Sequence, residues 1–324
     1  MSSPAALAAH DLVKTYPAGR GAPPVHALDG LSVEVAAGSV VALLGRNGAG
    51  KSTTVKILTT LARADAGQAS VAGLDVARDQ VAVRRAIGLV SQKASSDPMS
   101  TGRENLVLAG RIQGLSRSVA TQRAAELVDR FELADAADRL AKTYSGGMAR
   151  KLDVAIGLVH RPQVLFLDEP TTGLDPEART QMWAEIARLS ADEQVTVLLT
   201  THYLEEADRL ADRVAIIDSG RVVVEGTPEQ LKSELRGDTV QVELAGPAPA
   251  AVPALSRVAG LRDVTLDGSR LRARADHGAT AVPAVLAALD DAGVAVASVT
   301  VARPSLDDVY LRHVGRAFRE EVAA

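Results

Sequence analysis

Short apolar runs, each closed by glycine or polar residues, recur along the first two thirds of the chain. Val40–Leu44 is followed at once by a glycine-rich turn and a helical pattern that extends to Leu61. Similar runs span residues 87–90, 164–167 and 195–200. Unbroken apolar runs are typical of parallel strands that helices cover on both faces. The pattern therefore predicts an α/β fold with a mostly parallel core sheet.

A different pattern begins after residue 235, where an Ala/Pro-rich stretch at 245–253 favours a domain boundary. We expect two domains, 1–235 and 236–324. Alternation in the second predicts, in order, strand 239–244, helix 252–259, strands 262–267 and 270–275, helix 279–291, strand 294–301 and a helix from Ser305. The order βαββαβ suits a small ferredoxin-like α+β module.

Composition limits the classes of function that are open to the chain. Its 324 residues are enough for about two domains, and 47% hydrophobic content is typical of a globular protein. A net charge of -4 and 2% aromatic residues argue against nucleic acid as a main partner. The absence of cysteine excludes disulfides and thiolate metal sites, and it fits a reducing compartment. We see neither a signal peptide nor an apolar stretch of about 20 residues, so we expect a soluble chain.

The glycine-rich turn after the first apolar run matches the phosphate-binding pattern G-x-x-x-x-G-K-[ST]. Glycines let backbone N–H groups converge on phosphate oxygens, while the lysine reaches the β- and γ-phosphates and the serine can ligate Mg²⁺. The alternative, an ordinary glycine turn before a helix, is disfavoured by the full match between a strand and a helix. The predicted nucleotide-binding residues are Gly45, Asn47, Gly48, Gly50, Lys51, Ser52 and Thr53.

Two carboxylates, Asp168 and Glu169, end the apolar run 164–167. Ligands of open α/β sheets bind at the carboxyl ends of the strands, and two adjacent acids there favour a cation. We expect Asp168 to join the Mg²⁺ shell, directly or through water. We expect Glu169 to polarise the water that attacks the γ-phosphate. The alternative is a solvated acidic turn that caps the next element.

Ser145-Gly146-Gly147 stands a short distance ahead of this acidic strand end, before a helical pattern that extends to His160. An isolated Ser-Gly-Gly is usually a simple helix N-cap. Its place between the phosphate loop and the acidic pair resembles the Leu-Ser-Gly-Gly-Gln signature of the ABC-transporter ATPases. Tyr144 and Met148 replace the usual Leu and Gln.

The resemblance implies roles for other residues that occur in the family's motif order. Ser145, Gly146 and Gly147 would touch the γ-phosphate of ATP that is bound by the opposite subunit. Gln92 would be the Q-loop glutamine, which senses Mg²⁺ and the membrane partner. The metal-site candidates are thus Ser52, Gln92 and Asp168. By itself, a glutamine after a strand is more often an ordinary loop residue.

Three further positions match family motifs. Asp175 would belong to the D-loop at the dimer interface, although it also suits an N-cap before Pro176. His202 would be the switch histidine that contacts the γ-phosphate, so the catalytic candidates are Glu169, His202 and Lys51. Tyr16 would be the aromatic residue that stacks on adenine; its alternative is an ordinary strand aromatic.

As a whole, the resemblance implies a P-loop NTPase of the ABC type, with an antiparallel β subdomain and a helical subdomain at about 93–160. The segments 144–148, 201–208 and 303–311 are similar to the daunorubicin/doxorubicin-resistance drug-efflux ATPases. That subgroup implies an ATP-hydrolysing subunit that binds ATP and Mg²⁺, forms a homodimer on ATP binding, and powers export of a drug-like or lipid-like compound.

Its partner would be a separate integral-membrane permease, and the chain itself would be peripheral at the cytoplasmic face of the cell membrane. We expect Lys93–Ser100 to form part of the partner surface, and residues 236–324 to aid dimerisation or regulation. The alternatives are an ABC ATPase of another transport system, including import, and a soluble ABC ATPase that acts on ribosomes or DNA. A small-molecule kinase would have no need of the Ser-Gly-Gly motif.

Overall fold

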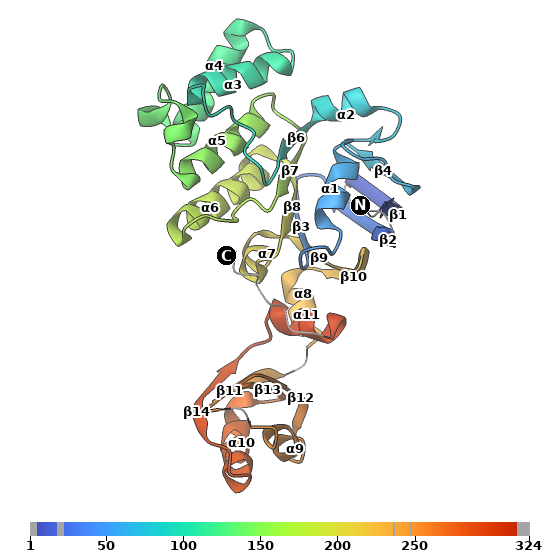
Figure 1. Cartoon of the computed structure of the whole chain (residues 1–324), viewed down its shortest axis with the longest axis vertical. Helices are drawn as coiled ribbons and strands as arrows, with labels where there is room; N and C mark the ends of the chain where they lie inside the picture. The colour runs from blue at the N-terminus through green and yellow to red at the C-terminus, as the bar shows by residue number, and fades with distance from the viewer. Residues whose placement is uncertain (1–4, 18–22, 236, 247, 316–324) are drawn as a thin grey trace. The chain divides into compact units, whose positions relative to one another are not determined.

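The computed structural model describes residues 5–17, 23–235, 237–246 and 248–315 (Figure 1). The last residues of the expected C-terminal domain lie outside this range. The chain divides into two compact units, the first ending at Pro228 and the second beginning at Glu229. The division precedes residue 235 because Leu235 is buried and its carbonyl accepts a 2.7 Å hydrogen bond from Arg274.

A six-stranded sheet forms the centre of the first unit (Figure 1). Neighbouring strands in this sheet are parallel, except that β10 is antiparallel to β9. This confirms the predicted, mostly parallel core sheet. In spatial order the strands are β10 (Arg221–Gly226), β9 (Arg213–Asp218), β3 (Val40–Leu44), β8 (Thr196–Thr201), β7 (Val164–Asp168) and β6 (Ile87–Val90).

An antiparallel sheet packs beside this core and confirms the expected β subdomain. Its strands are β2 (Val25–Ala36), β1 (Ala5–Tyr16), β4 (Ala66–Val71) and β5 (Leu74–Asp75). The helix α1 (Lys51–Leu58) shares an apolar core with both sheets, in which Ile57 packs with Leu31 and Phe166. This helix ends at Leu58, not at Leu61 as predicted, because the backbone enters the left-handed region at Thr60 with φ +63°.

Helices cover the other parts of the first unit, and α3, α4 and α5 lie together beyond the β6 edge of the core sheet (Figure 1). The cap of α3 is a capping box made by Thr101 and Glu104. Short 3₁₀ turns at 134–136 and 141–143 precede α5. The helices are α2 (Gln80–Ala86), α3 (Gly102–Ile112), α4 (Arg117–Arg130), α5 (Gly146–Leu158), α6 (Pro176–Glu193) and α7 (Leu204–Leu210).

The second unit begins within the short helix α8 (Pro228–Ser233) and continues with β11, α9, β12, β13, α10, β14 and α11. Its antiparallel sheet has the order β12-β13-β11-β14, so the first and third strands lie in the centre, as in a ferredoxin-like fold. Val240, Leu271 and Leu289 belong to its apolar core. The bounds are β11 (Asp238–Leu244), α9 (Ala251–Leu255), β12 (Leu261–Asp267), β13 (Arg270–Ala275), α10 (Gly278–Asp291), β14 (Val296–Ala302) and α11 (Leu306–Val314).

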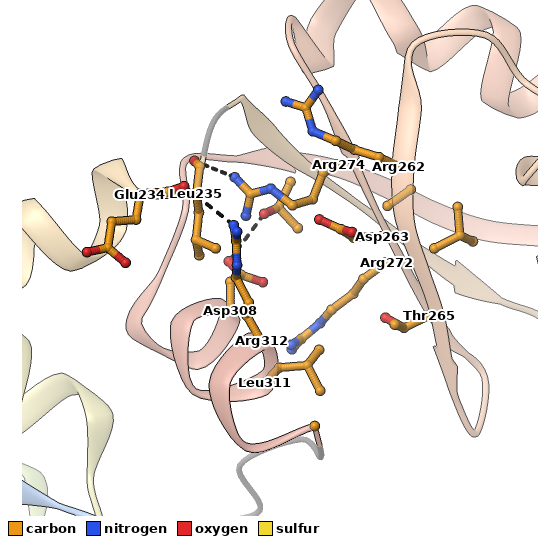
Figure 2. Close-up of a pocket in the computed structure, with 14 residues that line it drawn as sticks. Glu234, Leu235, Arg262, Asp263, Thr265, Arg272, Arg274, Asp308, Leu311 and Arg312 are labelled. Carbon is orange, nitrogen blue, oxygen red and sulfur yellow. Dashed lines mark hydrogen bonds between the residues drawn. The ribbon is translucent and has the colours of Figure 1, made fainter. Parts of the chain in front are cut away.

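Polar contacts fasten α11 to the sheet of this unit, around a pocket of about 760 Å³ (Figure 2). Arg272 forms an ion pair with Asp307, and Thr239 donates a 3.2 Å hydrogen bond to Asp308. Asp308 also completes a capping box with Ser305. The two acids of the segment 303–311 therefore anchor the helix to the sheet. Among the described residues, no helix is both long and apolar enough to cross a membrane.

Candidate active site

The core sheet brings the predicted motifs together because they follow neighbouring strands. The phosphate loop follows β3, the acidic pair ends β7 and His202 follows β8. Leu44 pairs with Thr201, and Asp168 pairs with Thr200, so the three strands end at the same level. In open α/β sheets this edge is the place where ligands bind.

The phosphate loop depends on glycine at several points. The backbone has φ +81° at Gly48 and +113° at Gly50, values that L-residues rarely adopt. A Cβ at Gly50 would also fall 2.7 Å from the carbonyl oxygen of Ala27. The loop is closed by Lys51, whose Nζ donates hydrogen bonds to the carbonyls of Gly45 at 2.7 Å and Arg46 at 3.2 Å. Its amine is thus held inside the curve that the glycines form.

Glu169 lies between two basic side chains. Its Oε1 is 3.4 Å from Lys51 Nζ, and its Oε2 is 3.1 Å from His202 Nδ1. Burial by itself would raise the pKa of Glu169, but the close imidazole of His202 and the charge of Lys51 outweigh it, and the net shift is downward. Glu169 is therefore an ionised carboxylate at neutral pH, which is the form that can accept a proton.

The Glu169 backbone is held in an uncommon conformation, with φ +51°. Its N–H donates to Thr200 twice, to the carbonyl oxygen at 3.1 Å and to Oγ1 at 3.0 Å. These bonds from the neighbouring strand β8 fix the turn at the end of β7 and therefore the direction of the Glu169 side chain.

Asp168 meets the phosphate loop at a hydroxyl. Ser52 Oγ donates to its Oδ1 at 3.1 Å, and Thr200 Oγ1 donates to the same atom at 2.6 Å. A carboxylate and a hydroxyl at one point are oxygen donors of the kind that Mg²⁺ prefers. Among the described residues, no cluster of three or more His, Cys, Asp or Glu side chains could hold a metal ion by itself. Ser52 and Asp168 therefore fit a Mg²⁺ ion whose other ligands would come from nucleotide phosphates.

The other predicted residues lie elsewhere on the unit. Ser145 caps α5, accepting from Met148 N–H at 3.2 Å, and Asp175 caps α6, accepting from Ala178 N–H at 2.8 Å. Both are exposed. Tyr16 ends β1, half-buried, with Lys14 Nζ 5.4 Å from its ring centroid. Gln92 is exposed just beyond the end of β6. Gly146 and Gly147 form the first turn of α5, and Thr53 lies in the first turn of α1.

Two buried residues of the site escaped the sequence-based prediction. Thr200 bonds to both Asp168 and the Glu169 backbone, as described above, and the signal for it is a hydroxyl at the end of the strand next to β7. Arg150 lies on the buried face of α5, 8% exposed, and its guanidinium reaches the backbone of the acidic pair. In the sequence, the only signal for Arg150 is a charged residue at helical spacing among apolar residues.

Comparisons with known proteins agree with this geometry. Residues 28–172 match the family described as ABC transporter, and residues 226–314 match the C-terminal domain of the DrrA1-3-like ATP-binding proteins. The chain is 48% identical over 302 residues to the daunorubicin resistance ATP-binding protein DrrA3 of Streptomyces coeruleorubidus, covering 92% of this chain and 94% of that protein.

The daunorubicin/doxorubicin resistance ATP-binding protein DrrA of Streptomyces peucetius is 48% identical over 314 residues, covering 96% of this chain and 92% of that protein. Among solved structures, a dimeric bacterial ABC transporter cassette is 25% identical, with a TM-score of 0.63, covering 68% of this chain and 98% of the other.

The fold and the site thus define an ABC-type ATPase: a P-loop NTPase in which an acidic strand end faces a phosphate loop. More specifically, the chain belongs to the daunorubicin/doxorubicin-resistance family of ABC transporter ATP-binding proteins. It is an ATP-hydrolysing subunit of an exporter, and the alternatives considered from the sequence are not favoured.

Proposed function

We propose that two copies of this chain close around two ATP–Mg²⁺ complexes and that their hydrolysis drives a drug-like or lipid-like compound through a separate membrane subunit. The observation that carries the proposal is the joint placement of Lys51, Ser52, Asp168, Glu169 and His202 at one sheet edge. The names of the relatives support a drug-type substrate.

In the proposed reaction, Lys51 moves from Glu169 to the β- and γ-phosphates, to which its position under the glycine loop directs it. Ser52 and Asp168 would hold Mg²⁺, Asp168 directly or through water, and the bound ion would neutralise phosphate charge. Gln92 would join them when its loop approaches the nucleotide. Tyr16 would stack on the adenine ring.

Glu169 would accept the proton of the attacking water, and His202 would orient that carboxylate and contact the γ-phosphate. The 3.1 Å contact between His202 Nδ1 and Glu169 Oε2 supports this pairing, because a general base needs a partner that fixes its direction.

The exposed positions of Ser145 and Asp175 support action across a dimer interface. Ser145 stands at the start of α5 with Gly146, where a Cβ would meet nothing within 4 Å. The helix N-terminus thus presents open backbone N–H groups, which suit a phosphate of the opposite subunit. The dimeric state of the similar solved cassette supports the same arrangement.

A groove on the first unit supports the proposal of a membrane partner. Its volume is about 410 Å³, and its lining includes Ser95 and Asp97 of the expected partner surface. Three apolar side chains on its lining are exposed: Leu61 at 65%, Leu108 at 53% and Ile112 at 76%. Large exposed apolar side chains that gather at one groove are typical of a protein interface. On this proposal the chain is peripheral at the cytoplasmic face of the membrane.

For the second unit we keep the proposal that it aids dimerisation or regulation. Its own apolar core and its fastened helix α11 support an independent role. ATP-dependent dimerisation and transport that are unchanged after deletion of residues 237–324 would refute it.

Replacement of Glu169 by Gln tests the proposed reaction. We expect Glu169→Gln to keep ATP affinity, lower kcat by a factor on the order of 10² to 10⁴, and accumulate an ATP-bound dimer, because the base is lost while phosphate contacts remain. ATP binding, turnover and size-exclusion chromatography measure the three quantities. The exposed Glu205→Gln is the control. Turnover near the wild-type rate in Glu169→Gln would refute the role of Glu169.

A further inference from the structure

Arg150 is a buried cation whose four hydrogen bonds all end on backbone carbonyls. Its Nε donates to Pro170 at 2.7 Å and its Nη1 to Ser91 at 2.7 Å. Its Nη2 donates to Glu169 at 3.1 Å and to Asp168 at 3.3 Å. The fork of a guanidinium suits this task, because five N–H groups in a fixed plane can reach several acceptors at once.

These carbonyls belong to two separate motifs. Asp168 to Pro170 form the acidic turn, and Ser91 directly precedes Gln92. Arg150 itself stands on α5, the helix that begins with the signature residue Ser145. One side chain therefore joins the loop of Gln92, the backbone of Glu169 and the signature helix.

Asp153, one turn further along α5, fastens the other end of the same loop. It is 3% exposed, and its Oδ1 accepts from the N–H groups of Ser95 at 2.9 Å and Ser96 at 3.2 Å. Residues 91–96 are thus held to α5 at both ends, by Arg150 as donor and by Asp153 as acceptor.

Burying these two charges is costly, because a charged group that leaves water must recover its hydration through hydrogen bonds. An apolar side chain could fill the position of Arg150 without that cost, but it would leave four carbonyls at the acidic turn and the loop unlinked. The arrangement therefore fixes the positions of the acidic turn and of the loop at the end of the sheet where the reaction is proposed.

We infer that Arg150 is a positioning residue for ATP hydrolysis: it holds Gln92 and Glu169 in one arrangement relative to the signature helix, with Asp153 fixing the loop. The inference rests on the proposed roles of Gln92 and Glu169. It also implies that a partner that moves loop 93–100 moves α5 and the acidic turn with it.

The test compares Arg150→Gln and Arg150→Lys in the full chain with Arg130→Gln. Arg130 is a matched control because it is another arginine with little exposure, 14% of its side chain, and it links helices through ion pairs with Glu185 and Glu193. We measure kcat, the Kd for ATP, the Mg²⁺ concentration at half-maximal rate, and Tm.

For Arg150→Gln we expect kcat to fall by about tenfold to a hundredfold, because misplacement of reacting groups by about 1 Å has effects of this size. Half-saturation by Mg²⁺ should need more Mg²⁺, while the Kd for ATP changes much less. Arg150→Lys should recover part of kcat, since an ammonium keeps the charge but reaches fewer carbonyls. Arg130→Gln should lower Tm and leave kcat and Mg²⁺ dependence unchanged.

Wild-type kcat and Mg²⁺ dependence in Arg150→Gln would overturn the inference, as would losses that match those of Arg130→Gln. If Arg150→Gln does not fold, wild-type kinetics in Arg150→Lys overturn it equally. Glu169→Gln distinguishes a failure of the proposed function from a failure of this inference. An inactive Glu169→Gln beside a fully active Arg150→Gln refutes only the role of Arg150.

Discussion

Glu206 is a buried acid in α7, the helix that follows His202. It is 0% exposed, and its Oε1 accepts from Thr171 Oγ1 at 2.8 Å and from Trp183 Nε1 at 3.1 Å. Within the described part of the chain, its buried Oε2 has no hydrogen-bond partner. Burial raises the pKa of Glu206, and the hydrogen bonds oppose that rise only in part.

The raised pKa predicts a pH-dependent stability. Between the unfolded value of 4.5 and the higher folded value, the folded state binds more protons, so stability falls as pH rises through this window. Glu206→Gln cannot ionise, so it should match wild-type stability at low pH and exceed it increasingly as pH rises. The fluorescence of Trp183, the single tryptophan, reports unfolding in thermal melts at each pH.

The matched control is Glu205→Gln, an exposed neighbour, which should leave the pH profile unchanged. A Glu206→Gln variant whose deficit relative to wild type grows as pH rises would contradict this interpretation of the buried carboxyl.

At the level of single residues, the sequence predicted the side chains that belong to recognisable motifs. Lys51, Asp168, Glu169 and His202 meet in the structure, although their roles stay predictions. Thr200 could not be predicted because its contribution depends on which strand pairs with β7. The same holds for Arg150, whose acceptors are carbonyls that come together only after the sheet and α5 have packed.

At the level of elements, apolar runs predicted the buried strands well, because a strand covered on both faces leaves a run with no polar interruption. The ends of helices were harder to predict than the strands. The pattern after the phosphate loop predicts a helix that continues to Leu61, but Thr59 Oγ1 donates a 2.8 Å hydrogen bond to the Val55 carbonyl and the helix ends at Leu58. The exposed Leu61 then becomes part of a groove and not of a core.

That groove gives an element-scale prediction. Ile112, at the end of α3, should contact the membrane subunit, so Ile112→Asp should reduce co-purification with it by about tenfold or more, because an interface would then bury an unpaired charge. ATP binding by the isolated chain should not change. Val119→Asp on α4, where Val119 is 50% exposed, is the control. Undiminished co-purification with Ile112→Asp would exclude the groove as the contact.

For the whole molecule, the two units differ in how far the sequence could describe them. The first carries motifs whose order defined the family, a prediction that the comparisons confirm. In the second, alternation predicted the element order βαββαβ, and the elements from β11 to β14 follow this order along the chain. Its function could not be predicted in the same way, because packing positions in a small α+β module carry no chemistry of their own.

The central claim about the whole molecule is that one chain supplies the phosphate loop and its partner supplies the signature. Within a chain, Ser145 caps α5, while the contact between Lys51 and Glu169 lies at the end of the core sheet. In a dimer with twofold symmetry, the signature of each chain would face the phosphate loop of the other, which gives two equivalent sites.

Crosslinking of a chain that carries Asn47→Cys, Ser145→Cys and Glu169→Gln tests this claim most directly, because the native chain contains no cysteine. A short thiol crosslinker is added with or without ATP and Mg²⁺, and denaturing gels separate covalent dimers from monomers. Single-cysteine chains are the controls. We predict covalent dimers that require ATP and both cysteines, whereas a crosslink confined to the monomer would contradict the account.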